Sequence, residues 1–392
     1  MAKKRLHTKS RFGCDQCRQR RVKCDEKAPI CSMCKQKGHV CIFSRIGPRM
    51  RPREDCIHFP RPPHGNICQL TADVSSSVFQ GSQSARNYPT PGSTPPQLAI
   101  STRSRELELM HRWGARTSVC FSTKRNLHVR DLVARKALQH DYALNALFAL
   151  ASIDIACSSE DVTRRLDYGR SALQYQNRAL IGLSNVLCDL SPANCDAITI
   201  SSILIMVCTM VQPLLRLNQD NNNPEVSDIV LSAAVCVKGI SAIIDISDQW
   251  LRNGPMHFLL YQRERDLSVP SWTTFPIERL HSINRDECSG EVHGLFEDAI
   301  CQLKQYIDLD VSVVPWLMTV GQPFRNELQQ ENSMSLLILM HWGVALETFN
   351  NTWWESFAGR RIVEESSTKL LSRGNPWPLP TTWCRQYVGL QG

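Results

Sequence analysis

The sequence lacks the short motifs that identify several large classes of enzyme. Its 392 residues contain no His-Glu-x-x-His segment for a catalytic metal, no Gly-x4-Gly-Lys loop for nucleotide phosphates and no Gly-x-Ser-x-Gly turn for a nucleophilic serine. One pair, His140 and Asp141, resembles an acid–base arrangement, but the start of a helix with Asp as its N-cap residue explains it better. We therefore predict that the protein is not an enzyme.

Acidic side chains are scarce at the N-terminal end of the chain. Residues 1–53 contain 3 Asp+Glu against 16 Lys+Arg, a net charge of +13, whereas residues 54–392 contain 34 against 29, a net charge of −5. The overall formal charge of +8 hides this contrast. An excess of positive charge confined to one end is typical of a nucleic-acid-binding module joined to a second domain.

The N-terminal stretch MAKKRLHTKSRF has no apolar core after its basic residues, so the sequence does not predict a secretory signal and we expect an intracellular protein. Clustered cysteines in a reducing compartment bind metal more often than they form disulfides. Residues 197–215, AITISSILIMVCTMVQPLL, carry no charge. Hydroxyl, amide and proline residues dilute that apolar run, and we predict a buried core helix rather than a membrane span.

Six cysteines lie in the segment CDQCRQRRVKCDEKAPICSMCKQKGHVC. The pattern Cys-x2-Cys-x6-Cys occurs twice, with the second copy 17 residues after the first. Zinc in a structural site takes four tetrahedral ligands, so six thiolates serve either one ion with two to spare or two ions with two bridging sulfurs. The repeat favours two Zn²⁺ bridged by the equivalent positions Cys14 and Cys31. The predicted metal ligands are Cys14, Cys17, Cys24, Cys31, Cys34 and Cys41.

Other uses of these thiols fit the sequence less well. A ferredoxin-like iron–sulfur cluster has tighter spacing, and a thioredoxin-like redox pair belongs to a βαβ unit that the sequence does not indicate. The other 11 cysteines, among them Cys157, Cys208 and Cys236, are scattered among apolar residues, and we predict that they are small buried side chains.

The cysteine segment resembles the zinc binuclear cluster of fungal transcription regulators, whose spacing it matches throughout. In that family the first and fourth cysteines bridge two zinc ions, which agrees with Cys14 and Cys31, and Pro29 matches the family's loop proline. The resemblance covers about a tenth of the chain. It implies a nuclear, sequence-specific regulator of transcription that binds double-stranded DNA and acts on the transcription machinery of RNA polymerase II genes.

The basic residues lie where the first cysteines are predicted to hold a single helical turn, from near Cys14 to about Arg20. A helix this short is not stable alone in water. Zinc binding therefore supplies the folding free energy that stabilises the helix. In the family, the end of this helix enters the major groove and reads a CGG-like triplet, and by motif position Arg20 and Arg21 become the base-reading pair. Phosphate contacts are expected from Arg18, Lys23, Lys27 and Lys35. An ordinary solvated charge is the alternative for each of them.

Proline marks the next segment of the chain. Residues 42–97 contain nine of the 21 prolines and no heptads, so we predict a disordered linker that does not form a coiled coil. The resulting division is a DNA-binding domain at 1–44 with its core at 14–41, a Pro/Ser-rich linker at 45–100 and an all-α regulatory domain at 101–392.

Apolar residues return at helical spacing after the linker. One stripe is Leu144, Leu147, Phe148, Ala151 and Ile155, and a second is Leu166, Leu173, Leu180, Leu183 and Leu187. Further helices are expected at about 196–211, 228–246, 293–307, 333–350 and 353–371. The tryptophans near the C-terminal end, Trp353, Trp354, Trp377 and Trp383, are predicted to close the core. The protein is therefore expected to be mostly α.

The segments LELMHRW, HDYALNALFALASIDIA, RSALQYQNRALIGL, NCDAITISSILI and WWESFAGRRIVEE resemble the helical regulatory domain of sterol-uptake-control-type fungal regulators. This domain type also occurs in regulators of secondary-metabolite gene clusters. The resemblance implies a regulator of such a biosynthetic cluster. The alternative is a regulator of lipid or sterol genes that responds to a sterol or another hydrophobic ligand bound by the helical domain. Neither of these two functions involves a membrane.

Overall fold

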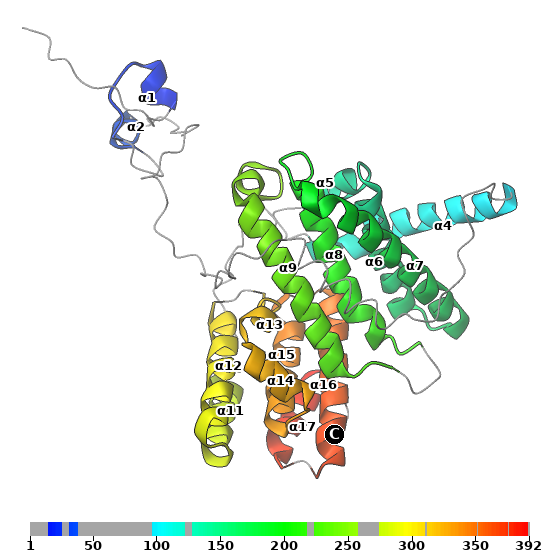
Figure 1. Cartoon of the computed structure of the whole chain (residues 1–392), viewed down its shortest axis with the longest axis vertical. Coiled ribbons are helices and arrows are strands. Elements are labelled where there is room, and N and C mark those ends of the chain that lie inside the picture. Colours follow the sequence, from blue (N-terminus) through cyan, green and yellow to red (C-terminus); the bar gives the residue numbers. More distant parts are fainter. Residues whose placement is uncertain are drawn as a thin grey trace, which may run out of the picture. The chain divides into compact units, whose positions relative to one another are not determined.

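The computed structural model describes residues 15–25, 31–37, 96–121, 128–217, 223–257, 274–309, 312–350, 352–374 and 376–390. The chain forms two compact units, Met1–Arg61 and Pro62–Gly392 (Figure 1). Every regular element among these residues is helical, which confirms a cysteine cluster followed by an all-α C-terminal region. The part of the predicted linker at 45–95 lies outside the described residues, and its last residues begin a helix at Pro96.

The first unit contains two short helices, α1 (Asp15–Gln19) and α2 (Ser32–Lys37). They begin 17 residues apart, the same interval that separates the two cysteine triplets. Each helix carries the second cysteine of its triplet, Cys17 in α1 and Cys34 in α2, and both side chains are buried. The sequence repeat is therefore also a structural repeat.

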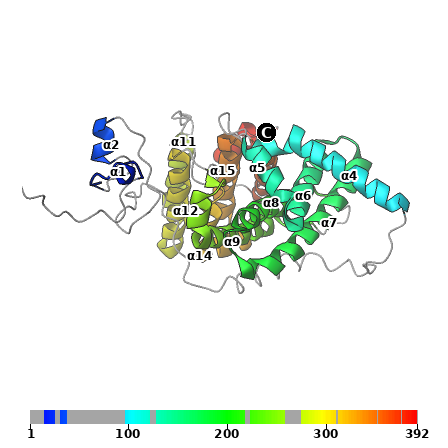
Figure 2. The ribbon, with the colours of Figure 1, turned by 90° about the horizontal axis from the view of Figure 1, so that it is seen from above.

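The second unit is a bundle whose helices form two groups (Figures 1 and 2). The first group is α4 (Pro96–Ala115), η1 (Thr117–Phe121), α5 (His128–Ala137), α6 (Asp141–Ser158), α7 (Val162–Val186), η2 (Leu187–Asp189), α8 (Cys195–Leu214) and α9 (Val226–Asn253). The second group is α11 (Thr274–Glu287), α12 (Gly290–Asp308), α13 (Trp316–Thr319), α14 (Gln322–Gln329), α15 (Ser333–Asn350), α16 (Trp353–Ser372) and α17 (Pro378–Tyr387). Contacts of α16 with α8 and of α13 with α9 join the groups into one core.

Helix α8 lies at the centre of the first group and contacts α6, α7 and α9. Both α8 and α9 are long and apolar enough to span a bilayer, but 83% of the apolar window of α8 and 39% of that of α9 is buried within the protein. The hydroxyl groups of α8 donate hydrogen bonds to carbonyl oxygens four residues earlier, from Thr199, Ser201 and Ser202. These bonds satisfy polar groups inside the core, and α8 is the buried core helix that its sequence predicts.

Several sequence expectations need correction. The N-cap of α6 is His140 rather than Asp141, which is the first helical residue. On α7 the buried face consists mainly of Tyr168, Ala172, Tyr175, Ala179 and Leu183, whereas Leu173 is exposed. Leucine spacing therefore identified the helix and the buried residues Leu183 and Leu187, but not the alanine and tyrosine side chains that pack where α7 lies against α6.

The scattered cysteines are mostly buried, as predicted, but not all of them. Cys208 and Cys236 are buried and Cys157 is partly buried. Burial raises the pKa of Cys236 to about 11 and that of Cys157 to about 12, so these thiols stay protonated at neutral pH. Cys188 and Cys301 are exposed, and the prediction is wrong for these two residues.

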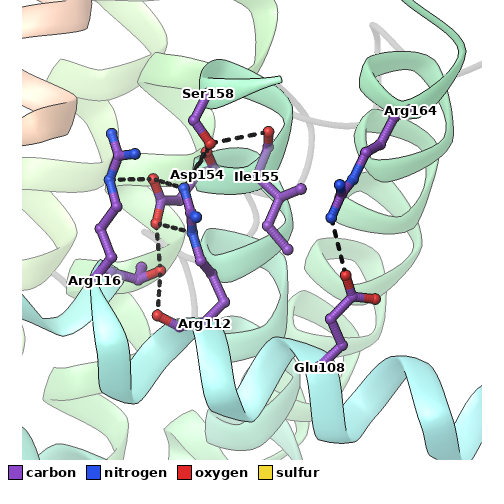
Figure 3. A network of polar contacts seen from close by, with 8 residues as sticks. Glu108, Arg112, Arg116, Asp154, Ile155, Ser158 and Arg164 are labelled. Atoms are coloured by element: carbon purple, nitrogen blue, oxygen red, sulfur yellow. Dashed lines mark hydrogen bonds and ion pairs between the residues drawn. The ribbon is translucent and has the colours of Figure 1, made fainter. Parts of the chain in front are cut away.

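A buried carboxylate fixes α4 to α6 (Figure 3). Asp154 on α6 has no exposed side-chain surface and accepts hydrogen bonds from Arg112 Nε at 2.8 Å and Thr117 Oγ1 at 2.8 Å. Arg116 Nε lies 3.4 Å from the same carboxylate. Because both arginines are partly exposed, they neutralise the buried charge while their guanidinium groups keep some contact with water.

Helices α15 and α16 approach each other closely where Gly343 faces Gly359. A methyl group added at Gly359 would lie 3.1 Å from the backbone nitrogen of Glu347 and closer still to the carbonyl oxygen of Gly343. The two nearest atoms belong to the backbone and the third is Glu347 Cβ at 3.3 Å, so a side-chain rotation cannot accommodate a larger residue.

We expect Gly359→Ala to lower the free energy of unfolding by about 1–3 kcal/mol, because the two helix backbones must separate. Gly239→Ala is the matched control, since Gly239 lies within α9 and a methyl group there meets nothing within 4 Å. This control should be neutral or gain up to about 1 kcal/mol from helix propensity. Urea unfolding of both full-length variants tests the contact, and equal stabilities would contradict it.

Candidate zinc cluster and DNA-contact site

Three of the six predicted zinc ligands converge in the first unit. The Sγ atoms of Cys17, Cys24 and Cys31 lie within 4.8 Å of one another, and all three residues are buried. The Sγ atoms of Cys17 and Cys31 are 3.6 Å apart. Tetrahedral zinc with Zn–S distances of about 2.3 Å places two ligand sulfurs about 3.8 Å apart. The described sulfurs therefore fit a shared zinc ion.

Cys31 contacts ligands from both halves of the repeat. Its sulfur lies next to Cys17 of the first half and accepts a hydrogen bond from the backbone N–H of Cys34, at 3.3 Å. A sulfur that serves both ions must occupy such a position. Cys14 and Cys41 lie outside the described residues, and their roles remain predictions.

A carboxylate holds the second half of the cluster against the first. Asp25 follows Cys24 and accepts hydrogen bonds from the backbone N–H of Ser32 at 3.1 Å and from its hydroxyl at 2.6 Å. Ser32 begins α2, where backbone N–H groups have no partner inside the helix. This contact, which spans seven residues, was not expected from the sequence.

The chain turns sharply at the end of α1. The N–H of Arg21 donates to the carbonyl of Arg18 at 3.1 Å, and the N–H of Val22 donates to that of Cys17 at 3.0 Å. This pair of bonds defines a Schellman motif, in which Arg21 takes the left-handed position with a φ of 56°. That conformation costs a non-glycine residue about 1–2 kcal/mol. The turn returns the chain to the cluster at Cys24.

The basic residues around this turn all face solvent. Arg18, Arg20, Arg21 and Lys23 are exposed and lie within a six-residue stretch between two buried cysteines. Metal–thiolate bonds on both sides would hold their backbone rigid. Lys27 and the side chain of Lys35 lie outside the described residues.

The helical unit contains a histidine–cysteine pair that resembles a catalytic pair only in composition. His341 Nδ1 lies 3.6 Å from Cys384 Sγ and 2.8 Å from the carbonyl oxygen of Leu337. Burial lowers the pKa of His341 to about 4 and raises that of Cys384 well above its usual range. Both groups are therefore neutral and inaccessible at pH 7, and the pair belongs to the core.

Sequence reasoning missed a second group of metal-ligand side chains, formed by His281, Glu297 and Cys301. The i, i+4 spacing of Glu297 and Cys301 was the only signal, and it is common on helices by chance. Their proximity to His281 depends on how α11 packs against α12.

Comparisons with known proteins agree with this architecture. Residues 12–49 match the family model of the fungal Zn(2)-Cys(6) binuclear cluster domain. No solved structure is a significant match. A cluster of this type implies two Zn²⁺ per chain, and the buried sulfurs described above fit that donor set.

Three relatives show how far the similarity extends. The chain is 29% identical over 208 residues to the Zn(2)-C6 fungal-type transcription factor afumD of Aspergillus fumigatus, an alignment that covers 51% of this chain and 46% of that protein. It is 22% identical over 444 residues to a Zn(2)-C6 fungal-type transcription factor of Gibberella zeae, which covers 100% of this chain and 88% of the relative. It is 32% identical over 99 residues to sterol uptake control protein 2 of Candida albicans, covering 24% and 13%. The chain thus spans less than half of the Aspergillus relative.

We expect the isolated unit of residues 1–61 to bind two zinc ions and to unfold when a chelator removes them. Cys31→Ala should lose both ions because its sulfur serves both, whereas Cys34→Ala should retain more metal. Elemental analysis of the two variants tests the bridge, and equal zinc retention would contradict it.

Acid should destabilise the helical unit through His341. Its pKa is about 4 in the folded protein and about 6.5 when unfolded. The unfolded state therefore binds the extra proton, and stability present above pH 6.5 falls as the pH drops toward 4, by up to about 3 kcal/mol. All nine tryptophans lie in the second unit, so their fluorescence reports its unfolding. His341→Gln should flatten this pH dependence, and an unchanged slope would refute the assignment.

Proposed function

Since this chain belongs to the fungal Zn(2)-Cys(6) transcription factors and is not an enzyme, we propose that it reads a CGG-like triplet through Arg20 and Arg21. The observation that carries this proposal is the exposed turn after α1, held between buried cysteines. Arginine bonds guanine O6 and N7 with two parallel N–H groups, and a rigid backbone reduces the entropy lost on binding.

The remaining basic residues serve the DNA backbone in this proposal. Arg18 and Lys23 flank the reading pair and are exposed on the same turn. Contacts to phosphate set the position of a protein on DNA without reading sequence. Lys27 and Lys35 are assigned to phosphate on motif position alone.

The proposed organisation is a DNA-binding domain at 1–44 with the zinc ligands Cys14, Cys17, Cys24, Cys31, Cys34 and Cys41, a linker at 45–100 and a regulatory domain at 101–392. The protein acts in the nucleus on the transcription machinery of RNA polymerase II genes. Its targets form a secondary-metabolite biosynthetic gene cluster, a proposal that rests on the sequence resemblance of the helical domain. Genome-wide mapping of its binding sites tests this, and sites dispersed among unrelated genes would contradict it.

Neither of two recesses in the helical unit favours the hydrophobic-ligand alternative. One recess beside His341 and Trp383 has a volume of about 10 Å³. A second, of about 320 Å³, is open and includes Arg360, Arg361 and Glu364 in its lining. Binding sites for drug-sized molecules are enclosed, mostly apolar and about 300–1,000 Å³ in volume. These two recesses therefore do not support sterol binding.

We expect Arg21→Gly to weaken binding to a CGG-containing duplex by about 1–3 kcal/mol and to leave binding to a scrambled duplex nearly unchanged. Glycine accepts the left-handed conformation of this position, so the side chain is removed without straining the turn. Lys23→Ala should weaken both duplexes by the same factor. Titrations at one salt concentration separate the two roles. If Arg21→Gly lowers the affinity for both duplexes by the same factor, Arg21 contacts phosphate rather than a base.

A further inference from the structure

The helices α11 and α12 bring together three side chains that bind metals in other proteins. His281 lies on α11, while Glu297 and Cys301 lie one turn apart on α12. One ligand atom from each lies within 4.8 Å of the other two. His281 Nδ1 is 2.8 Å from Glu297 Oε1. The DNA-binding function uses none of these residues.

The group is accessible from solvent. The His281 side chain is 18% exposed and that of Glu297 is 36% exposed, and Cys301 is an exposed residue. An ion can therefore enter without a rearrangement of the core. Water can also occupy a coordination position that the protein leaves open.

A buried amide orients the carboxylate of this group. Asn284 has no exposed surface, and its Nδ2 donates to Glu297 Oε2 at 3.0 Å and to the carbonyl oxygen of His293 at 3.0 Å. Outer hydrogen bonds of this kind fix ligand carboxylates in metal sites. The Oδ1 atom of Asn284 is buried and has no hydrogen-bond partner among the protein atoms.

We propose that His281, Glu297 and Cys301 bind a Zn²⁺ ion, with water as the fourth ligand, in addition to the two ions of the cysteine cluster. One thiolate, one imidazole nitrogen and one carboxylate oxygen form a donor set that suits zinc, whereas Mg²⁺ and Ca²⁺ take oxygen ligands. The Cys301 thiol releases its proton when the Zn–S bond forms, and no redox step is involved.

The histidine and the carboxylate need only a small adjustment to share an ion, and the Cys301 sulfur, which lies within 4.8 Å of both, must approach them by a side-chain rotation. Tetrahedral zinc with Zn–N and Zn–O distances of about 2.1 Å separates these two ligand atoms by about 3.4 Å. The His281–Glu297 contact of 2.8 Å must therefore open slightly, by rotation of two partly exposed side chains. The ion would join α11 to α12, so zinc bound only by the folded state also stabilises this pair of helices.

The test uses the full chain, dialysed against buffered micromolar free Zn²⁺ and analysed for metal. Wild type should hold three zinc ions, whereas Cys301→Ser and His281→Ala should each hold two. Cys288→Ser is the matched control and should hold three zinc ions. Cys288 lies in the short connection between α11 and α12, but its sulfur is not part of the group. Circular dichroism verifies that each variant is folded.

Cobalt gives a second readout that a purely structural role would not produce. Co²⁺ added to the chain that carries only its two cluster zinc ions should produce thiolate-to-cobalt absorption in wild type and Cys288→Ser, but not in Cys301→Ser. Two zinc ions in wild type, or a third ion that survives both Cys301→Ser and His281→Ala, would overturn the proposal. His281 and Glu297 would then be an ordinary hydrogen-bonded pair. The two cluster ions remain in either case, so this outcome leaves DNA reading untouched.

Discussion

Sulfur–metal coordination is the constraint on which the first unit depends. Its helices contain only five and six residues, far below the roughly 12–15 residues at which an isolated helix becomes even marginally stable in water. Among residues 15–25 and 31–37, the buried core consists of four cysteines, with Val22 and Met33 packed against them. Hydrophobic burial on this scale cannot order such a chain. The placement of the arginines, and with it the proposed reading of DNA, therefore follows from the bonds that the thiolates make.

The helical unit is stabilised in a different way. Its core is continuous and apolar from α4 to α17, and several of the polar groups inside it are held by specific partners. Hydroxyl groups in α8 bond to their own helix, and the Asp154 carboxylate is matched by two arginines. Helices α15 and α16 approach each other closely at Gly343 and Gly359, because glycine has no side chain to keep the two backbones apart.

Much of this organisation could be predicted from the sequence, because its signals are local. The cysteine repeat, the excess of positive charge before residue 54 and the helical spacing of apolar residues each need only a short window. Their readings as a zinc cluster and an all-α body are confirmed. The bond between Asp25 and Ser32 and the left-handed conformation of Arg21 could not be predicted in this way. Both arise when the folded cluster forces distant or unfavourable partners together.

Longer-range features were less accessible. The buried face of α7 uses alanine and tyrosine because α6 lies close, and no spacing rule identifies that neighbour. The group of His281, Glu297 and Cys301 likewise exists only once α11 packs against α12.

The chemistry of this group also differs from that of the cysteine cluster. Buried sulfurs shared between two ions form a closed site, whereas an exposed site with one thiolate and a water molecule is open to exchange. With fewer thiolate ligands and no shared sulfur, the exposed site would bind zinc less tightly. Zinc would then fill the cysteine cluster first. At free zinc concentrations that already saturate the cluster needed for DNA binding, the occupancy of the α11–α12 site would still vary.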